Sequence, residues 1–272
     1  DQQPYTLYGL STRPSYVMSH VTKQLHKAAR IILIGAPGVG KGTQSERLLA
    51  RFPQLASISS GDLLRENVRR RTPLGLEAEA TMQSGNLVPD SMILNLISDD
   101  MKSKGWLLPP SASSVQSATS SSSSSPADTS SSAHSIDSSA SFILDGFPRT
   151  AIQATTLDSL VPVNFVVHLI TPPSVILARI ASRWVHEPSG RVYNTDFHPP
   201  KVAGKDDVTG EPLTQREDDS LDTWKQRLRK FEETSKSLLE HYDRQRCLFR
   251  AEGNSSDEIS PKLFAEIERR FC

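Results

Sequence analysis

The sequence GAPGVGKGT at residues 35–43 directly follows the apolar run RIILI at residues 30–34. A buried strand that leads through a glycine-rich loop into a helix directs backbone amides and the positive helix end toward phosphate. In the general form of this loop, a Ser or Thr that binds Mg²⁺ comes directly after the lysine. Here Gly42 follows Lys41, and the hydroxyl comes one residue later, at Thr43. The stretch predicts a nucleotide site on a parallel sheet and raises the question of which phosphate chemistry uses this variant.

The rest of the chain favours the same kind of fold. Short apolar runs, typical of strands buried on both faces of a parallel sheet, occur at residues 30–34, 55–59, 142–144, 165–170 and 247–251. Stretches with helical periodicity lie between them, at residues 44–51, 91–102 and 173–183. Strands that alternate with helices indicate repeated βαβ units. We therefore expect an α/β fold, a P-loop core around a five-stranded parallel sheet.

The charge balance limits the classes of partner. Lys plus Arg and Asp plus Glu number 31 each, so no overall charge favours nucleic acid or a membrane surface. No apolar run reaches the length of a membrane span. Cys247 and Cys272 are too few for a disulfide framework or a cysteine-rich metal site. We expect small-molecule nucleotides as partners, no nucleic acid, no membrane and a monomer.

The first 29 residues are predicted to be a basic N-terminal extension. Their composition, poor in acids and rich in hydroxyls and basic residues, is typical of a transit peptide. Val21, Leu25 and Ala28 recur at helical spacing, which favours a short basic amphipathic helix. A frayed N-terminal arm is the alternative.

Two polar segments interrupt the alternation of strands and helices. Residues 111–141 are about half serine, and such a tract buries too little apolar surface to offset its ordering entropy. We expect a disordered, inert linker, so that removal of residues 113–140 leaves activity and stability almost unchanged. Residues 187–217 are rich in Pro, Gly, Asp and Lys and should lie outside the core.

Charged side chains suited to phosphates lie near the predicted strand ends. FILDGFPRT at residues 142–150 places Asp145 at the carboxyl end of a strand, where ligands bind in open parallel sheets. Asp145 suits Mg²⁺, and Arg149 suits a phosphate. SSGDLLRE at residues 59–66 predicts a capped helix start with Arg65 about one turn in. Further arginines are Arg179 and Arg183, four apart on one face of the predicted helix, Arg216 and Arg227.

The sequence resembles the adenylate kinases. The matching stretches, in the family's order and spacing, are GAPGVGKGT, SSGDLLRE, LVPD, LDGFPRT, RWVHEPSGRVYN, NTDFHPPKV and QREDD. The resemblance implies that GKGT is the family's form of the loop, with Mg²⁺ held largely by phosphates and water and by Asp145 through water. It also implies reversible transfer of a phosphoryl group from a nucleoside triphosphate to AMP.

The resemblance assigns residues to each part of the site. The implied catalytic residues are Lys41, Arg149, Arg183, Arg216 and Arg227. The implied donor-nucleotide site comprises Gly38, Val39, Gly40, Lys41, Gly42, Thr43, Arg179, Arg183, Val192, Tyr193 and Ser255. The implied AMP site comprises Ser60, Arg65, Asn86, Leu87, Val88, Gly146, Phe147, Pro148, Arg149, Gln153, Arg216 and Arg227.

Roles and subdomains follow from the same resemblance. Arg179 would stack on the donor base, and the amide of Gln153 would pair with adenine. The kinase domain would span residues 30–272, with an inserted NMP-binding subdomain at residues 59–88 and a lid at residues 182–219.

The branch within the family rests on finer features. SISSGDLLR, GRVYN and GEPLTQREDD, together with the basic extension, are most similar to mitochondrial-matrix GTP:AMP phosphotransferases, and Ser60 replaces a threonine usual in ATP-using relatives. We therefore expect GTP as donor, read by residues 252–256, and a mitochondrial matrix location. The alternatives are an ATP:AMP kinase, a cytoplasmic location and a non-catalytic nucleotide-binding regulator. A pyrimidine monophosphate kinase is disfavoured because Thr150 and Gln153 follow Arg149 in the AMP-specific pattern.

Four polar residues of the implied lid have the spacing of a four-ligand zinc site: His186, Ser189, Asp206 and Thr209. Ser and Thr hydroxyls are poor zinc ligands beside thiolate or imidazole. The sequence therefore predicts no zinc, and instead a hydrogen-bonded network around the Asp206 carboxylate. Four unrelated surface residues are the alternative.

Overall fold

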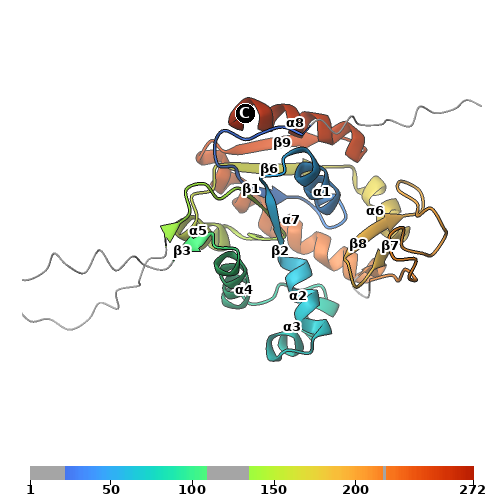
Figure 1. Ribbon diagram of the computed structural model, residues 1–272. Coiled ribbons are helices and arrows are strands. Elements are labelled where there is room, and N and C mark those ends of the chain that lie inside the picture. Colours follow the sequence, from blue (N-terminus) through green and yellow to red (C-terminus); the bar gives the residue numbers. More distant parts are fainter. Residues whose placement is uncertain (1–21, 109–134, 217–218) are drawn as a thin grey trace, which may run out of the picture.

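A computed structural model describes residues 22–108, 135–216 and 219–272. Five parallel strands form one sheet in the order β2-β5-β1-β6-β9 (Figure 1). The elements of this core are β1 (Arg30–Ile34), α1 (Lys41–Arg51), β2 (Ala56–Ser59), α2 (Ser60–Arg69), α3 (Pro73–Gln83), α4 (Asp90–Ser103), β5 (Phe142–Asp145), α5 (Ala151–Leu160), β6 (Phe165–Ile170), α6 (Pro173–Ala181), α7 (Leu221–Arg244), β9 (Leu248–Glu252) and α8 (Ser256–Phe271). Two antiparallel hairpins complete the structure: β3 (Leu107–Leu108) with β4 (Ser135–Ile136), and β7 (Arg183–His186) with β8 (Arg191–Asn194). The predicted α/β fold with a five-stranded parallel sheet is confirmed.

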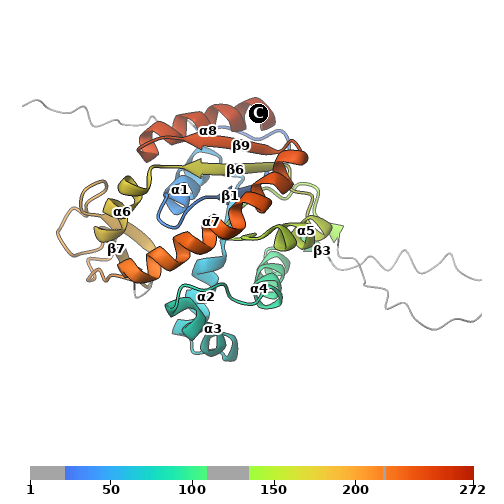
Figure 2. The same cartoon turned by 180° about the vertical axis from the view of Figure 1, so that it is seen from behind.

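The alternation of side chains along β1 divides the core into two layers. Ile31 and Leu33 pack on the face covered by α1 and α8, whereas Ile32 and Ile34 pack on the face covered by α4, α5 and α7 (Figures 1 and 2). All four side chains are almost fully buried. Because both faces carry helices, the strand is apolar throughout, as its sequence predicts.

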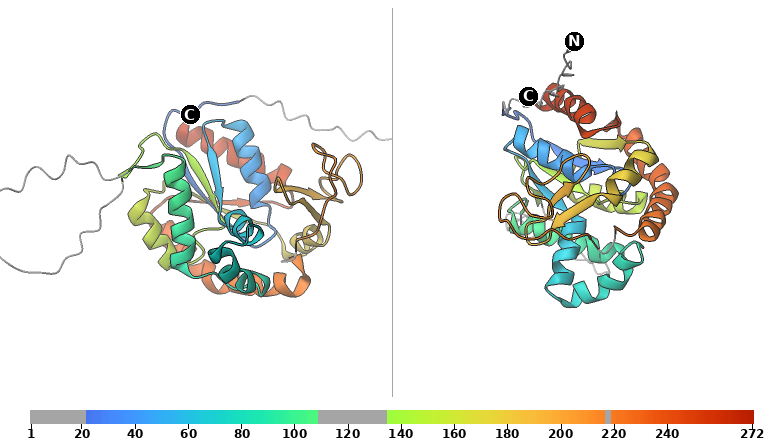
Figure 3. Two further views of the ribbon diagram at one scale, coloured as in Figure 1. Left: turned by 60° about the horizontal axis from the view of Figure 1, so that its bottom comes forward. Right: turned by 90° about the vertical axis from the view of Figure 1, so that its right-hand side faces the viewer.

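Two small units project from the carboxyl edge of the sheet. The helices α2 and α3 follow directly on β2, and the β7–β8 hairpin follows α6 (Figure 3). The long helix α7 runs behind the sheet and passes from the hairpin toward α5 (Figure 2). These units therefore surround the edge of the sheet where the phosphate loop lies. Within the described residues, no helix is both long and apolar enough to cross a membrane.

The boundaries of two predicted segments are wrong. Residues 22–29 contain no helix, and Leu25 and Ala29 are buried in the core beside α1 and α8. The amide of Lys23 donates to the carbonyl of Arg51, so this part of the predicted extension belongs to the domain. Residues 1–21, which hold the rest of the extension, lie outside the described residues.

The serine-rich segment ends earlier than predicted. Residues 135–141 are ordered: β4 pairs with β3, Ala140 is buried, and the Ser141 hydroxyl accepts from the Ala29 amide at 3.1 Å. The sequence missed this because the serines around the short apolar stretch hid it. The predicted disorder of the remaining tract concerns residues outside the described part of the chain.

Candidate active site at the carboxyl edge of the sheet

The phosphate loop connects β1 to α1 and ends at Gly40, the N-cap of α1. Gly38 and Gly40 have φ angles of 86° and 105°, which L side chains rarely adopt. A Cβ atom on Gly38 would also lie 2.6 Å from Cδ1 of Ile180 on α6. The side chain of Lys41 curls back over the loop, and Nζ donates to the carbonyls of Gly35 and Ala36 at 3.0 and 3.3 Å. The loop therefore holds the lysine amine over its own backbone.

Four of the predicted cationic residues act on the same place. Burial, together with the positive charges of Arg227, Arg149 and Arg183, lowers the pKa of Lys41 to about 8. Asp145 at the end of β5 opposes this shift. The residues come from α1, β5 and its following turn, β7 and α7. We call Lys41, Asp145, Arg149, Arg183 and Arg227 the active-site cluster.

Asp145 is the carboxylate of this cluster. Burial raises its pKa above the ordinary range, while Lys41 and Arg149 oppose the rise. Among the described residues, no three His, Cys, Asp or Glu side chains are grouped as metal ligands would be. Asp145 is thus a single hard oxygen ligand beside a phosphate loop, an arrangement that suits Mg²⁺ shared with phosphates and water.

Arg183 is not placed as the sequence predicted. The helix α6 ends at Ala181, and Arg183 begins strand β7 instead of lying one turn beyond Arg179. Its Nε donates to Oδ2 of Asp219 at 2.7 Å, and its Nη2 also contacts Asp219. The helical pattern misled because the strand that follows has apolar residues at a similar spacing. Arg179 and Arg183 therefore do not lie on one face of a helix.

Two side chains hold the phosphate loop from outside. Trp224 on α7 donates from Nε1 to the carbonyl of Pro37 at 2.9 Å and is 5 % exposed. Arg179 on α6 donates to the carbonyls of Val39 and Asn254, at 3.0 and 2.8 Å. Sequence reasoning missed Trp224 because a single tryptophan on a helix gives no signal about its partner. These contacts fix the loop relative to the turn after β9.

The turn between β9 and α8, predicted to read the donor base, is braced by side chains. Thr171 donates to the carbonyl of Gly253 at 2.9 Å, and the Asn254 amide donates to Glu258 at 2.8 Å. The hydroxyl of Ser255, assigned to the donor site, caps α8 by accepting from the Glu258 amide. The guanidinium of Arg179 lies 5.4 Å from the centre of the Phe197 ring. The turn is thus held in one conformation beside the loop.

The opposite side of the edge carries the residues assigned to AMP. Ser60 begins α2 and is 2 % exposed, and its hydroxyl has no hydrogen-bond partner within the described residues. Gly146, with a φ of 82°, faces it closely: a Cβ atom there would lie 2.6 Å from the Ser60 oxygen. A pocket opens here, lined by Leu64, Leu87, Val88, Ile93, Gly146, Phe147, Arg149 and Gln153. Six of the residues predicted for the AMP site, Arg149 among them, thus line one pocket.

Asp62 links the two projecting units. On α2, its carboxylate lies 2.5 Å from Nη2 of Arg65 and 3.8 Å from Nη2 of Arg216. These two arginines were assigned to phosphate binding and come from sequence positions far apart. Burial alone would raise the pKa of Asp62, but Arg65 and Arg216 outweigh it and hold the pKa below the ordinary value. A carboxylate therefore sits where the two arginines converge.

The amide of Gln153 is held at both ends. Its Oε1 accepts from the backbone amide of Arg149 at 2.7 Å, and its Nε2 donates to Oδ1 of Asp90 at 2.6 Å. The backbone amide of Gln153 donates to the hydroxyl of Thr150, the N-cap of α5. Thr150 and Gln153 thus form a variant of the capping box, in which the glutamine reaches one residue further back. Sequence reasoning missed Asp90, although the T-x-x-Q pattern signalled that the Gln153 oxygen was engaged.

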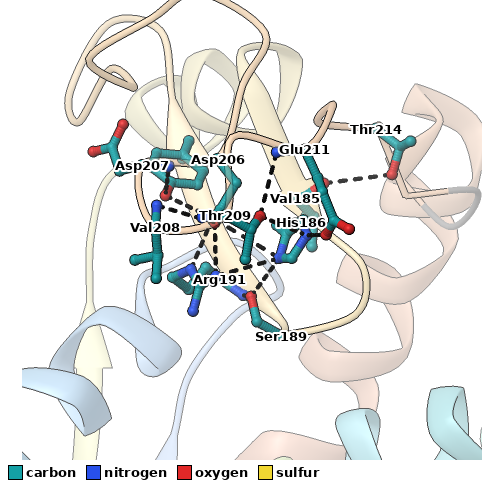
Figure 4. Close-up of polar contacts among 11 residues, drawn as sticks. Val185, His186, Ser189, Arg191, Asp206, Asp207, Val208, Thr209, Glu211 and Thr214 are labelled. Atoms are coloured by element: carbon teal, nitrogen blue, oxygen red, sulfur yellow. Dashed lines mark hydrogen bonds and ion pairs between the residues drawn. The ribbon is translucent and has the colours of Figure 1, made fainter.

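The lid residues form the predicted network (Figure 4). His186 Nδ1 lies 2.7 Å from the Ser189 hydroxyl, and the Thr209 hydroxyl donates to Asp206 Oδ2 at 3.0 Å. The Thr209 hydroxyl also lies 3.4 Å from His186 Nε2. His186 and Asp206 are only 2 % and 3 % exposed, so the alternative of four unrelated surface residues is wrong. Whether the lid holds zinc stays a prediction.

Three further side chains complete the network. Arg191 donates to both oxygens of Asp206 at 2.7 Å, Tyr193 donates to Asp206 at 2.8 Å, and Glu211 lies 2.5 Å from His186 Nε2. The hydrogen bonds from Arg191 are the main cause of an Asp206 pKa well below the ordinary range. We call this set the lid cluster: His186, Ser189, Arg191, Tyr193, Asp206, Thr209 and Glu211.

The remaining assigned residues occupy varied surroundings. Tyr193 was assigned to the donor site, but its side chain is buried in the lid cluster, whereas Val192 beside it is exposed. Asn86 donates from its side chain to Ser84 in the turn after α3. Near Gly42, a Cβ atom would meet no described atom within 4 Å, so this position is open toward the site.

Comparison with known sequences adds an independent finding. A sequence model of the family described as "Adenylate kinase" matches residues 33–121, and one described as "Adenylate kinase, active site lid" matches residues 183–218. A Saccharomyces cerevisiae protein named "GTP:AMP phosphotransferase, mitochondrial" is 42% identical over 252 residues, which cover 91% of this chain and 95% of the relative. A second Saccharomyces cerevisiae sequence of the same name is 42% identical over 240 residues, covering 86% of this chain and 94% of that relative.

Proposed function

The chain belongs to the adenylate kinase family of nucleoside monophosphate kinases, and we propose that it transfers the terminal phosphoryl group of GTP reversibly to AMP. The products are GDP and ADP. The observation that carries this proposal is the active-site cluster, in which Lys41 and three arginines act on one place between two projecting units. Phosphoryl transfer is catalysed mainly by positioning and by charges of this kind.

Each part of the site has a task in this reaction. In-line transfer forms a bond from an AMP phosphate oxygen to the γ-phosphorus, while the bond to the β–γ bridging oxygen breaks. Lys41 and the amides of the loop hold the donor phosphates, and Arg149 and Arg227 stabilise the charge of the transferring group. Arg65 holds the AMP phosphate. Arg183 and Arg216 enter from the lid side and exclude water as the units close.

Asp62 has a part in binding AMP. Its contacts with Arg65 and Arg216 support a role as an internal anion that holds these side chains until a phosphate replaces it. A substrate phosphate carries more charge than one carboxylate, so it wins this exchange. The arginines are then already positioned when AMP arrives.

The described residues fit a Mg²⁺ ion bound mostly by the nucleotide. Asp145 is one buried carboxylate at the strand end, and Thr43 supplies a hydroxyl in the first turn of α1. When bound, Mg²⁺ neutralises charge on the β- and γ-phosphates. Asp145 would hold it through water, since the raised pKa of this carboxyl falls again beside a cation.

The choice of GTP rests on the relatives' names and on the turn after β9. Guanine presents O6 as acceptor and N1–H as donor, where adenine presents the reverse, so a fixed turn that satisfies one leaves unpaired groups against the other. Contacts from Thr171 and Arg179 hold this turn, and the exposed amide side chain of Asn254 lies on it. The turn is therefore rigid enough to discriminate.

We also propose a mitochondrial matrix location, because the similar sequences are named as mitochondrial and because the first 29 residues are basic. The protein would act as a monomer on small nucleotides, without nucleic acid or a membrane. Fractionation of cells and light scattering of the purified chain test these two points.

The experiment that tests the proposed function is a donor panel with AMP as acceptor. GTP, ITP and ATP are compared, since ITP shares O6 and N1–H with GTP and lacks only the 2-amino group. We expect the kcat/KM of ITP to follow that of GTP and to exceed that of ATP by at least about tenfold. Equal or better efficiency with ATP would assign the chain to the ATP-using branch. Binding of nucleotides without turnover would indicate a regulator.

A further inference from the structure

The amide of Gln153 lies between two groups of opposite hydrogen-bonding character. The backbone amide of Arg149 can only donate, and it donates to Oε1 at 2.7 Å. The carboxylate of Asp90 accepts, and it accepts from Nε2 at 2.6 Å. A primary amide can be turned by half a turn with little change in shape, which exchanges its donor and acceptor. The two contacts together favour one orientation.

We propose that Asp90 is a positioning residue that fixes the Gln153 amide and thereby makes the acceptor site select adenine over 6-oxopurines. This inference rests on the proposed function, because it concerns the base of the acceptor AMP. Asp90 is the first residue of α4, the helix that follows α3 in the sequence. Gln153 lies in the first turn of α5. The contact thus joins two helices that line the pocket.

Gln153 is placed to meet a base. It is 3 % exposed, and it lines the pocket together with Leu64, Val88 and Ile93. Apolar walls give a bound purine little choice of polar partner, so the amide edge decides which base fits. With one N–H bonded to Asp90 and one lone pair to Arg149, the amide retains one donor and one acceptor.

That remaining pair matches adenine. Adenine presents an N6 amino donor beside the N1 acceptor, whereas hypoxanthine and guanine present an O6 acceptor beside N1–H. The reversed pair would bind only a reversed amide. Reversal would place Nε2 against the Arg149 amide and Oε1 against the Asp90 carboxylate, a donor facing a donor and an acceptor facing an acceptor. A mismatch of this kind costs about 1–3 kcal/mol where it is fully buried and less at the half-buried contacts of Gln153.

Asp90 is the anchor that can be removed. The Arg149 amide belongs to the backbone and survives every substitution except one by proline, whereas Asp90→Ala removes the hydrogen-bond acceptor of Nε2. Without the Asp90 carboxylate, rotation of the Gln153 amide by 180° breaks only its hydrogen bond with the Arg149 amide. Selectivity between adenine and a 6-oxopurine should therefore fall, although not vanish.

Asp90 also has an ordinary structural role at the start of α4. An acidic residue in the first turn stabilises a helix through its dipole, typically by about 0.3–1 kcal/mol. Loss of that role alone would weaken the binding of every acceptor equally. A change in the ratio between two acceptors is therefore the readout that a merely structural role would not move.

The test measures equilibrium binding of AMP and IMP, which share ribose and phosphate and differ at the six-position and N1. Binding is followed by calorimetry, and kcat and KM of both acceptors are measured with saturating GTP. We expect Asp90→Ala to weaken AMP binding, mainly through KM, and to lower the AMP-to-IMP binding ratio by about tenfold. Asp90→Asn keeps a carbonyl acceptor in place and should give a smaller fall. Ser91→Ala, next on the same exposed helix start, should leave the ratio unchanged.

Three results would overturn the proposal. An unchanged AMP-to-IMP ratio in Asp90→Ala would show that the Arg149 amide alone orients Gln153. A fall of the same size in Ser91→Ala would assign the effect to the start of α4 as a whole. If the wild-type protein selects AMP in binding but transfers no phosphoryl group, the proposed function fails while the binding ratios still decide this inference. Binding of IMP as tight as AMP to the wild type would contradict the inference directly.

Discussion

The active-site cluster and the lid cluster both hold charged side chains away from water, but they balance charge in opposite ways. In the lid cluster, Asp206 accepts hydrogen bonds from Arg191, Tyr193 and Thr209, and its pKa lies well below the ordinary range. In the active-site cluster, burial lowers the pKa of Lys41 to about 8 and raises that of Asp145. The ionised carboxylate of Asp206 is thus stabilised within the lid cluster, whereas burial disfavours the charged forms of Lys41 and Asp145.

This difference separates a structural polar cluster from a functional one. Strongly shifted pKa values occur in both kinds, so a shift by itself does not identify an active site. The direction is informative: in the lid the ionised form of Asp206 is favoured, and at the loop the charged forms of Lys41 and Asp145 are disfavoured. Substitutions in the two clusters should therefore have opposite consequences for activity and stability.

The largest effect should come from Lys41→Ala. Loss of a cation that touches the transferring phosphates should lower kcat/KM by at least about a hundredfold. The melting temperature should stay the same or rise, because the folded protein no longer buries a disfavoured positive charge. Steady-state kinetics and calorimetry of the same preparation check both parts.

Lys102→Ala is the matched control for this variant. Lys102 pairs with Asp99 on the exposed surface of α4, at 3.2 Å. Such pairs contribute little, so activity should be unchanged and stability should change by less than about 1 kcal/mol. A Lys41→Ala variant that keeps more than about a tenth of the wild-type rate would refute the assigned role of Lys41.

Asp206→Asn should show the reverse pattern. The variant loses the charge that Arg191 and Tyr193 surround, so opening of the lid becomes easier. We expect the protection of lid amides against hydrogen exchange to fall by about tenfold and kcat to fall less. Asp196→Asn, an exposed lid residue, is the control. Stoichiometric zinc in the purified wild type would show instead that the lid cluster is a metal site.

The two clusters also show what the sequence could and could not predict. The spacing of His186, Ser189, Asp206 and Thr209 predicted a network, because residues at both ends of two loops meet when the loops pair. Arg191 and Glu211 were missed, since which charged residue turns inward depends on the hairpin register, which brings His186 opposite Arg191. The parallel sheet was predictable because its strands are apolar on both faces.

The position of the active-site cluster in the fold was predictable for a different reason. Asp145 ends strand β5, and Lys41 lies after the loop that follows β1. The carboxyl ends of these parallel strands lie at one edge of the sheet, so the two residues meet there. Trp224 and Asp90 were not found, because each acts through a contact with a distant backbone or amide group that no local pattern encodes. The ordered β4 strand was missed because it is only two residues long within a serine-rich stretch.

The pH dependence of nucleotide binding should differ between variants of the two clusters. The pKa of Lys41 is about 8 in the free protein, and a bound phosphate favours the charged lysine, so binding should take up a proton near this pH. Affinity should therefore fall as pH rises, by about twofold between pH 7 and pH 8 from this group alone. Calorimetry in buffers of different ionisation enthalpy measures the uptake. Lys41→Met should abolish it, and Asp206→Asn should leave it intact.

For folding stability, the lowered pKa of Lys41 gives a pH dependence of the opposite sign. A lysine whose pKa is lowered in the folded state binds fewer protons there than in the unfolded chain between about pH 8 and its ordinary value. The contribution of Lys41 to stability should therefore become less unfavourable as pH rises through this window. Release of a proton on nucleotide binding would contradict the prediction for binding, and a stability that falls from pH 8 to pH 10 relative to Lys41→Met would contradict the one for folding.

The smallest effect should come from a region that belongs to neither cluster. The hairpin of β3 and β4 carries residues 109–134 between its strands and lies before β5, at the amino edge of the sheet, away from Lys41. If the tract is the flexible linker that its serine content predicts, each halving of its length changes the closure free energy by only about 0.6 kcal/mol. Deletion of residues 113–133 should therefore leave kcat unchanged and stability equal or slightly higher. Deletion of residues 113–140 should lower stability, because it also removes β4 and the buried Ala140. Thermal melts and kinetics of the two deletions distinguish a linker from a segment that takes part in catalysis, which would lower kcat in both.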